Sequence, residues 1–241
     1  MPKPDPQASQ DLAPSGRLRA ALNFGNQVLA VRSPTGEPQG VSVDLARAIA
    51  DASGLPLDFV QFDSAGKVFD ALAEGRWDLA FMAIDPVRGA QMDFTAPYVL
   101  IEGTYLVRGD APFQKTGDVD VEGVRIAVTR GSAYELFLTR RLMHATLVRV
   151  ERPEDALKTF LDQQLDALAA VRQPLNGFAA SHPDLRVLPD AFMRIEQAVG
   201  VPKGHEPAHR WLSQFVTEAK SNGWVAEALK RNGQGEANVA P

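Results

Sequence analysis

The segment Gly131-Ser132-Ala133-Tyr134-Glu135 has residue types suited to binding an anion. Ser132 and Glu135 have the Ser-x-x-Glu spacing of a capping box, which marks the first turn of a helix. The N–H groups and the positive dipole end at such a turn attract a carboxylate or a phosphate. The same residues would also make a well-capped helix with no ligand, and the sequence leaves both interpretations open.

The segment His205-Glu206-Pro207-Ala208-His209 matches the H-E-x-x-H pattern of zinc peptidases. That chemistry requires both histidines on one face of a continuous helix, and Pro207 would interrupt the helix between them. Pro207 instead suits the first position of a helix that carries Trp211 and Phe215, which places His205 outside that helix. Because no third ligand is evident, we expect no metal site.

Other catalytic signatures are missing from the sequence. There is no G-x-S-x-G elbow, no Walker A loop and no G-x-G-x-x-G turn, and His144 and His182 are isolated. The absence of cysteine excludes disulfides, thiolate metal sites and a cysteine nucleophile. We therefore expect no catalytic residue of these kinds and no cofactor.

The composition is that of a globular protein with an acidic balance. Of the 241 residues, 45% are hydrophobic and 23% are charged, with a net charge of −5, so a nucleic-acid partner is not expected. No apolar run reaches the ~18 residues of a membrane span. The stretch from Met1 to Ser15 lacks the basic and apolar regions of a signal peptide. We expect either a cytoplasmic protein or a leader outside this sequence.

Two stretches of the chain repeat one pattern. Residues 18–84 and 124–171 each read strand, helix, strand, helix, strand, and the clearest echo pairs 72–81 with 160–169. Each echo contains a helix end, a polar link, one aspartate and an apolar strand. This alternation predicts an α/β protein with mostly parallel sheets flanked by helices. Two such lobes imply a cleft between them that binds a small molecule.

Two extended segments, 104–107 and 196–201, would join the lobes as hinge strands. We expect lobe 1 to contain 17–105 and 199–232, and lobe 2 to contain 106–198. Residues 1–16 and 233–241 are rich in polar residues, glycine and proline, so we expect a disordered leader and a disordered tail.

Several strings resemble a known family. They are Gly40-Val41-Ser42-Val43-Asp44-Leu45-Ala46, Arg88 followed by Met92-Asp93-Phe94-Thr95-Ala96-Pro97-Tyr98, Gly131-Ser132, and Leu165-Asp166-Ala167. Over roughly residues 17 to 232 the chain is similar to type II periplasmic solute-binding proteins, in the amino-acid-binding branch of ABC transporters (solute-binding family 3). The resemblance implies a two-lobed fold that closes around a carboxylate-bearing ligand and presents it to a membrane permease. It also implies a periplasmic monomer.

The resemblance assigns ligand contacts to particular residues. The arginine of the Arg-x₄-Asp-Phe-Thr string holds the ligand carboxylate in that family, which implies this role for Arg88, although a surface arginine is the alternative. A guanidinium offers two parallel N–H donors to a carboxylate. Ser132 and Ala133 would bind the same carboxylate. Asn23 and Asn26 would line the cleft in lobe 1, and the lack of aromatic rings at positions 26 and 64 suggests a polar ligand.

One position departs from the family pattern. The aspartate that usually holds the ligand ammonium is replaced by Val171, which is followed by Arg172. Either Asp85 supplies the negative charge, or the ligand has no ammonium and Arg172 favours a dicarboxylate or another organic anion. The simpler alternatives are that Asp85-Pro86 begins a turn and that Arg172 points to solvent.

Two other functions remain open at this stage. Cyclohexadienyl dehydratases are similar proteins that act on a bound acid, and they would need Asp85, Glu102 or Glu196 as a general acid. The same fold also serves as a ligand-sensing module without transport.

Overall fold

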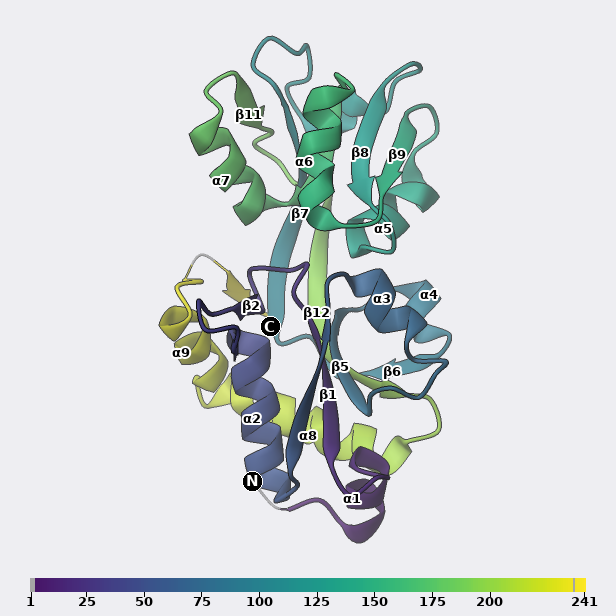
Figure 1. Ribbon diagram of the computed structural model, residues 1–241, viewed down its shortest axis with the longest axis vertical. Helices are drawn as coiled ribbons and strands as arrows, with labels where there is room; N and C mark the ends of the chain where they lie inside the picture. Colours follow the sequence, from purple (N-terminus) through teal and green to yellow (C-terminus); the bar gives the residue numbers. More distant parts are fainter. Residues whose placement is uncertain (1–2, 236) are drawn as a thin grey trace. The chain divides into compact units, whose positions relative to one another are not determined.

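The computed structural model describes residues 3–235 and 237–241, which form two α/β units. Unit 1 contains residues 1–100 and 196–241, and unit 2 contains residues 101–195. Figure 1 labels the elements along the chain. The boundaries that we expected, after residue 105 and before residue 199, differ from these by a few residues because β7 (Val99–Arg108) and β12 (Met193–Pro202) each contribute residues to both units.

Unit 1 has a central parallel sheet in the order β4-β1-β5, with β12 antiparallel to β5. Its other elements follow the order of the chain: α1 (Pro6–Leu12), β1 (Leu18–Asn23), β2 (Val31–Arg32), β3 (Pro38–Gln39), α2 (Val41–Ser53), β4 (Leu57–Phe62), α3 (Ala65–Asp70), β5 (Leu79–Ala83), α4 (Pro86–Gly89), β6 (Met92–Phe94), α8 (Glu206–Ser221), α9 (Trp224–Arg231) and β13 (Asn238–Val239).

Unit 2 repeats this arrangement with the order β7-β10-β8-β9, in which β10, β8 and β9 are parallel. Its elements are a 3₁₀ turn (Thr116–Val119), β8 (Arg125–Thr129), α5 (Ala133–Arg141), β9 (Thr146–Val150), α6 (Pro153–Asp162), β10 (Ala167–Val171), α7 (Arg172–Ser181) and β11 (Leu185–Val187). The predicted fold class, with mostly parallel sheets flanked by helices, is therefore confirmed.

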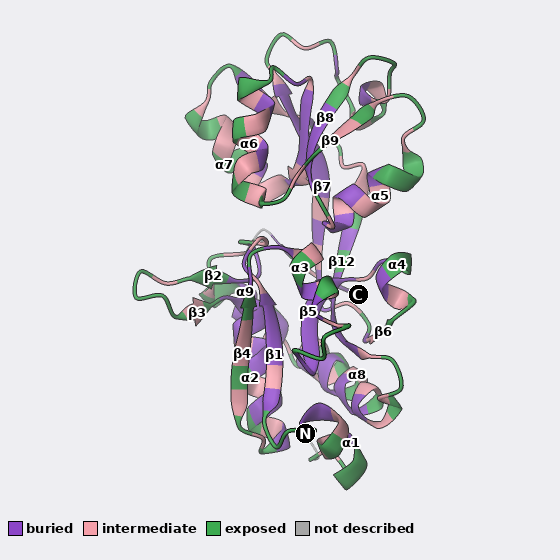
Figure 2. Ribbon diagram, turned by 45° about the vertical axis from the view of Figure 1, so that its right-hand side comes forward, coloured by how far each residue is buried: buried purple, intermediate pink, exposed green. Residues whose placement is uncertain are grey.

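Alternation along the strands explains how unit 2 buries both faces of its sheet. Ala167 and Ala169 of β10 pack with Leu138 of α5 on one face. Leu168, between them, packs with Phe160 of α6 on the other face. Successive strand residues point to opposite faces, so a strand covered on both sides reads as a continuous apolar run. Figure 2 shows the neighbouring strands β7 and β8 as mostly buried segments.

The aspartates of the sequence echo hold equivalent positions in the two units. Asp78 accepts the backbone N–H of Arg19 at 2.9 Å, and Asp166 accepts the backbone N–H of Arg125 at 2.7 Å. In return, the N–H of Asp78 donates to the carbonyl of Arg19 and that of Asp166 donates to the carbonyl of Arg125. Each aspartate therefore fixes the start of the last strand against the first strand of its unit.

The expected disordered leader is contradicted by α1. Asp5 caps this helix, because its carboxylate accepts the N–H of Ala8 at 2.8 Å. Pro6 then occupies the first turn, where it loses no hydrogen bond. Ala8 and Leu12 are buried, and the helix packs against α8, as Figure 1 also shows.

The expected disordered tail is also contradicted, for the described residues of that segment. Asn238 and Val239 form β13, antiparallel to Val99 and Leu100 of β7. Ala240 is 3% exposed, and its N–H donates to the carbonyl of Tyr98 at 3.1 Å. The tail is ordered because it completes backbone pairing along a strand that would otherwise expose its edge.

Candidate functional site

The carboxyl edge of the unit 1 sheet brings together residues far apart in sequence. Because β1 lies between β4 and β5 and all three are parallel, their carboxyl ends meet at one edge. Asn23 ends β1, Ser64 follows β4, and Asp85 follows β5. Ligands of open α/β sheets bind at this kind of edge. The structure thus places Asn23, Asn26 and Asp85 at this edge, and the ligand contacts predicted for them stay predictions.

The two asparagines at this edge differ in their hydrogen bonds. The side-chain oxygen of Asn23 accepts the N–H of Gly25 at 3.0 Å, so it stabilises the turn after β1. The backbone of Asn26 belongs to the same turn, since its N–H donates to the carbonyl of Asn23 at 3.3 Å. The side-chain oxygen of Asn26 is buried and has no hydrogen-bond partner within the described part of the chain. Of the two side-chain oxygens, that of Asn26 is the one without a hydrogen bond from the described residues.

Asp85 is the N-cap of α4 and is 5% exposed. One of its oxygens accepts the N–H of Val87 at 2.8 Å, and Pro86 occupies the first turn of α4. The simpler sequence interpretation, a turn beginning at Asp85-Pro86, is therefore confirmed. The ligand role predicted for Asp85 stays a prediction.

Arg88 lies on α4 and is 1% exposed. Its guanidinium donates from Nη1 to the carbonyl of Ala83 at the end of β5, at 2.9 Å. Burial lowers the pKa of Arg88 to about 10, while the charge of Asp85 acts in the opposite direction. Arg88 is therefore a buried cation at neutral pH, held next to the unit 1 edge, and it is no surface arginine.

Unit 2 has a corresponding edge where β8 and β10 end. Ser132 caps α5 there, because its hydroxyl accepts the N–H of Glu135 at 3.1 Å. The helix start predicted from Ser132 and Glu135 is confirmed. The return bond differs from an ideal capping box: Glu135 Oε2 accepts the N–H of Gly131 at 3.1 Å, one residue before the cap. The backbone N–H of Ser132 donates to the carbonyl of Thr129 instead.

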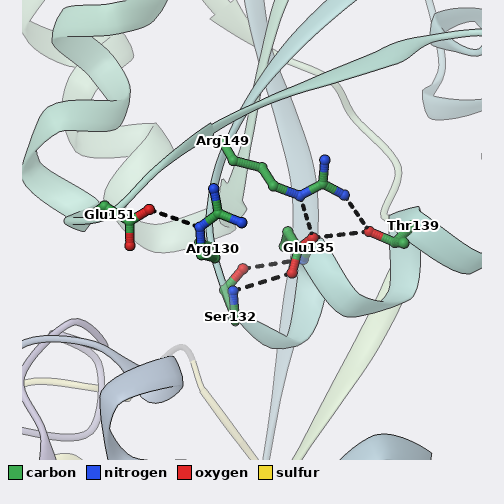
Figure 3. A network of polar contacts seen from close by, with 7 residues as sticks. Arg130, Ser132, Glu135, Thr139, Arg149 and Glu151 are labelled. Carbon is green, nitrogen blue, oxygen red and sulfur yellow. Dashed lines mark hydrogen bonds and ion pairs between the residues drawn. The ribbon is translucent and has the colours of Figure 1, made fainter. Parts of the chain in front are cut away.

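Glu135 places a buried negative charge behind this turn (Figure 3). It is 5% exposed, and Oε1 accepts from Arg149 Nε at 2.7 Å and from the Thr139 hydroxyl at 2.9 Å. Its charge is thus balanced by Arg149, which is only partly exposed. Among the donors of the first turn, the N–H groups of Ala133 and Tyr134 have no intrahelical acceptor. These two N–H groups suit the anion role predicted for this turn, and the ligand contacts predicted for Ser132 and Ala133 stay predictions.

The end of β10 differs sharply from the end of β5. Val171 is 8% exposed and is the N-cap of α7, to which it brings no side-chain hydrogen bond. Arg172 Nε donates to Glu102 at 2.6 Å. Its other nitrogens donate to the carbonyls of Leu188, Pro189 and Asp190. Arg172 therefore holds the 188–190 segment, and the solvent-pointing alternative is wrong. Its predicted contact with a second ligand carboxylate would have to compete with Glu102.

Gln173 was not singled out from the sequence. It follows Arg172 in the first turn of α7, and its side-chain oxygen is buried without a hydrogen-bond partner among the residues described. A signal for it was present: Gln173-Pro174 comes seven residues after Asp166, as Asp85-Pro86 comes seven residues after Asp78. Continuing the echo past the strand ends would have identified this position.

In the H-E-x-x-H segment, the position of Pro207 correctly predicted that His205 lies outside the helix. His205 is the N-cap of α8, outside the helix, and His209 Nε2 contacts the carbonyl of Phe94 at 2.9 Å. No group of three histidine or carboxylate side chains suited to a metal is found within residues 3–235 and 237–241. Nor does any helix in the same residues have the length and apolar character to cross a bilayer.

The chain contains two α/β units that share the strands β7 and β12, and each unit has polar groups at the carboxyl edge of its sheet. These features define the type II periplasmic binding protein fold. Residues 21–234 match the model of bacterial extracellular solute-binding proteins, family 3, and the chain belongs to that family.

Individual relatives agree with this assignment. A glutamine-binding protein of Geobacillus stearothermophilus is 22% identical over 194 residues, covering 78% of this chain and 73% of the relative. A cyclohexadienyl dehydratase of Pseudomonas aeruginosa is 24% identical over 222 residues, covering 90% and 82%. An amino acid ABC transporter substrate-binding protein from Streptococcus pneumoniae, bound to L-arginine, has a similar fold, with a TM-score of 0.79, 21% identity and coverage of 94% and 98%.

Proposed function

We propose that this protein is a solute receptor that binds a small polar carboxylate, an amino acid or another organic acid, and presents it to an ABC-type permease. Membership of family 3 supports binding of a small ligand. The observation that supports a carboxylate ligand is the buried guanidinium of Arg88 beside the carboxyl edge of the unit 1 sheet. The charge of Asp85 acts on this group, and a guanidinium also offers parallel N–H donors that match the two oxygens of a carboxylate. The family description also favours a location outside the cytoplasm.

Binding would shift a population of conformers rather than drive chemistry. At 1% exposure Arg88 cannot touch a ligand until the groups covering it move. We therefore expect ligand binding to rearrange the segment around α4. In unit 2, we expect the N–H groups of Ala133 and Tyr134 to be the donors that suit an anion.

The test is a thermal-shift and calorimetry screen of amino acids and organic acids. A ligand present at 100 times its Kd should stabilise the wild-type protein by about 2.7 kcal/mol. Arg88→Lys keeps a positive charge but loses the two parallel donors, so affinity should fall at least tenfold. Arg47→Ala, which removes an exposed arginine of the same unit, is the control. Unchanged affinity in Arg88→Lys, or no ligand for the wild type, would refute the proposal.

An enzyme on the same fold is the second candidate, favoured by the match to a cyclohexadienyl dehydratase. The structure offers it two carboxylates besides Asp85: Glu102 is bound by Arg172, and Glu196 is exposed. Incubation with a cyclohexadienyl acid separates the two functions. Turnover that disappears in Asp85→Asn or Glu102→Gln would favour the enzyme, and a bound but unchanged acid would favour the receptor.

A further inference from the structure

Gln173 lies at the carboxyl edge of the unit 2 sheet, two residues past the end of β10. Ala167 and Leu168 of β10 lie opposite Ile126 and Ala127 of the parallel strand β8, so the two strands end at nearly the same level. Gln173 at the start of α7 and the capped turn at the start of α5 therefore follow neighbouring strands at one edge. This edge is where open α/β sheets bind ligands.

The side-chain oxygen of Gln173 is a buried acceptor without a hydrogen-bond partner in the described part of unit 2. Such an atom loses its hydration without compensation, and most buried polar atoms in proteins are paired. The two residues that precede Gln173 give this oxygen no hydrogen bond. Val171 adds no polar group, and Arg172 donates to Glu102 and to three carbonyls.

The corresponding residue of unit 1 shows what is unusual about Gln173. Asp85 holds that place, and its carboxylate accepts the N–H of Val87 two residues further along its own helix. Gln173 makes no such bond with Leu175, two residues further along α7, since its oxygen has no partner. In unit 1 the side-chain acceptor therefore caps its own helix, whereas in unit 2 the amide oxygen of Gln173 makes no bond to α7.

We propose that Gln173 is a specificity-determining residue whose amide oxygen accepts a hydrogen bond from an N–H group of the ligand. This inference rests on the proposed receptor function and narrows its ligand to a carboxylate that also carries nitrogen, such as an amino acid. A dicarboxylate brings no donor at neutral pH and would leave the oxygen buried and unsatisfied. The dipole of this amide would take the place of the negative charge of the aspartate that the family pattern has where this chain has Val171.

Calorimetry on the full chain tests this with two nitrogen-bearing ligands, L-glutamine and L-arginine, and two dicarboxylates, succinate and glutarate. The wild type should prefer the nitrogen-bearing pair. Gln173→Leu should lose about tenfold in affinity for them, as expected for one hydrogen bond. Gln173→Glu should keep or improve the binding of L-arginine and weaken any binding of the dicarboxylates. Gln163→Leu makes the same side-chain change at an exposed position of unit 2 and should change nothing.

The outcomes separate this inference from the receptor function. If the wild type binds dicarboxylates better, or if Gln173→Leu matches Gln163→Leu, the role of Gln173 is refuted while the receptor function stands. If the wild type binds no small carboxylate in this panel or the wider screen, the receptor function fails and this inference fails with it. Circular dichroism checks folding, and if Gln173→Leu does not fold, the ligand preference of Gln173→Glu decides.

Discussion

The two units agree at one edge of their sheets and differ at the other. At the amino end of the last strand, Asp78 and Asp166 make the same reciprocal backbone bonds with Arg19 and Arg125. At the carboxyl end, unit 1 has a capping carboxylate and a buried guanidinium, whereas unit 2 has an uncapped helix behind Val171. The two units are alike where the start of the last strand of the repeat is bonded to the first strand. The two units differ at the carboxyl edge, where the proposed function places the ligand contacts.

The bonds around Asp78 should contribute more to stability than those around Asp166. Asp78 also forms a two-pronged ion pair with the Arg19 side chain, at 2.6 and 3.0 Å, and its side chain is 3% exposed. We expect Asp78→Ala to cost about 3 kcal/mol, because it leaves a buried N–H and a partly buried guanidinium unpaired. Asp166→Ala removes one carboxylate contact with Arg125 N–H and should cost about 1 kcal/mol.

These two variants can be followed separately in each unit. Trp77, Trp211 and Trp224 are the three tryptophans of the chain, and all lie in unit 1. Tryptophan fluorescence during urea unfolding therefore reports on unit 1, and circular dichroism reports on both units. Equal losses in the two variants would contradict the difference between the aspartates.

Glu135 should be the most important acidic side chain of unit 2. It accepts hydrogen bonds from three groups, and Glu135→Ala would leave Arg149 and the Gly131 N–H without this acceptor. We expect a loss of about 2 kcal/mol, measured by urea unfolding. The matched control is Glu151→Ala, because Glu151 pairs with Arg130 at 2.7 Å on the surface (Figure 3). An exposed pair contributes little, so this variant should melt like the wild type.

Arg172 should stabilise unit 2 without contacting the ligand. Arg172→Met removes the bond to Glu102 and the donors to the 188–190 carbonyls, and we expect it to cost roughly 1–2 kcal/mol. Ligand affinity measured by calorimetry should stay within twofold of the wild type. A loss of affinity for dicarboxylates alone would instead restore the ligand role predicted from the sequence.

Acid should weaken unit 2 through Asp120. Burial works to raise the pKa of Asp120, but the N–H groups of Met143, His144 and Ala145 at 2.8–2.9 Å outweigh it, and the pKa is lowered. A lowered folded-state pKa gives stability that is present above the unfolded value of about 3.9 and is lost as pH falls through the folded value. Asp120→Asn should therefore lose less melting temperature than the wild type between pH 6 and pH 3.

The corresponding control in unit 1 is Asp58. Its pKa is lowered by a hydrogen bond from Arg17, but the pair is exposed at the surface. Salt screens such pairs, so Asp58→Asn should change the acid dependence little at 0.15 M salt. A larger effect at Asp58 than at Asp120 would contradict the importance given to the three backbone donors.

Signals that lie close together in sequence predicted much of the fold. The spacing of Ser132 and Glu135 located the start of α5, and Pro207 placed His205 before α8. The echo between 72–81 and 160–169 predicted the two similar sheets. The polar edge of unit 1 could be predicted as well, because parallel strands bring their carboxyl ends together.

Contacts between residues far apart in the sequence were not predicted. The leader and the tail were expected to be disordered because of their polar, proline- and glycine-rich composition, and single buried apolar residues such as Leu12 and Ala240 give no periodic signal against it. They are ordered by α8 and β7, which lie far away in sequence.

The sequence by itself determined the repeated α/β pattern, the helix caps and the buried strands, because each depends on residues a few positions apart. Only the tertiary structure decided which polar side chains remain available. Arg172 is occupied by Glu102, 70 residues away, whereas the amide oxygens of Asn26 and Gln173 are buried without a partner in the described chain. The physical reason is that the availability of a donor or acceptor depends on every group that packs around it, and packing joins residues irrespective of their order in the chain.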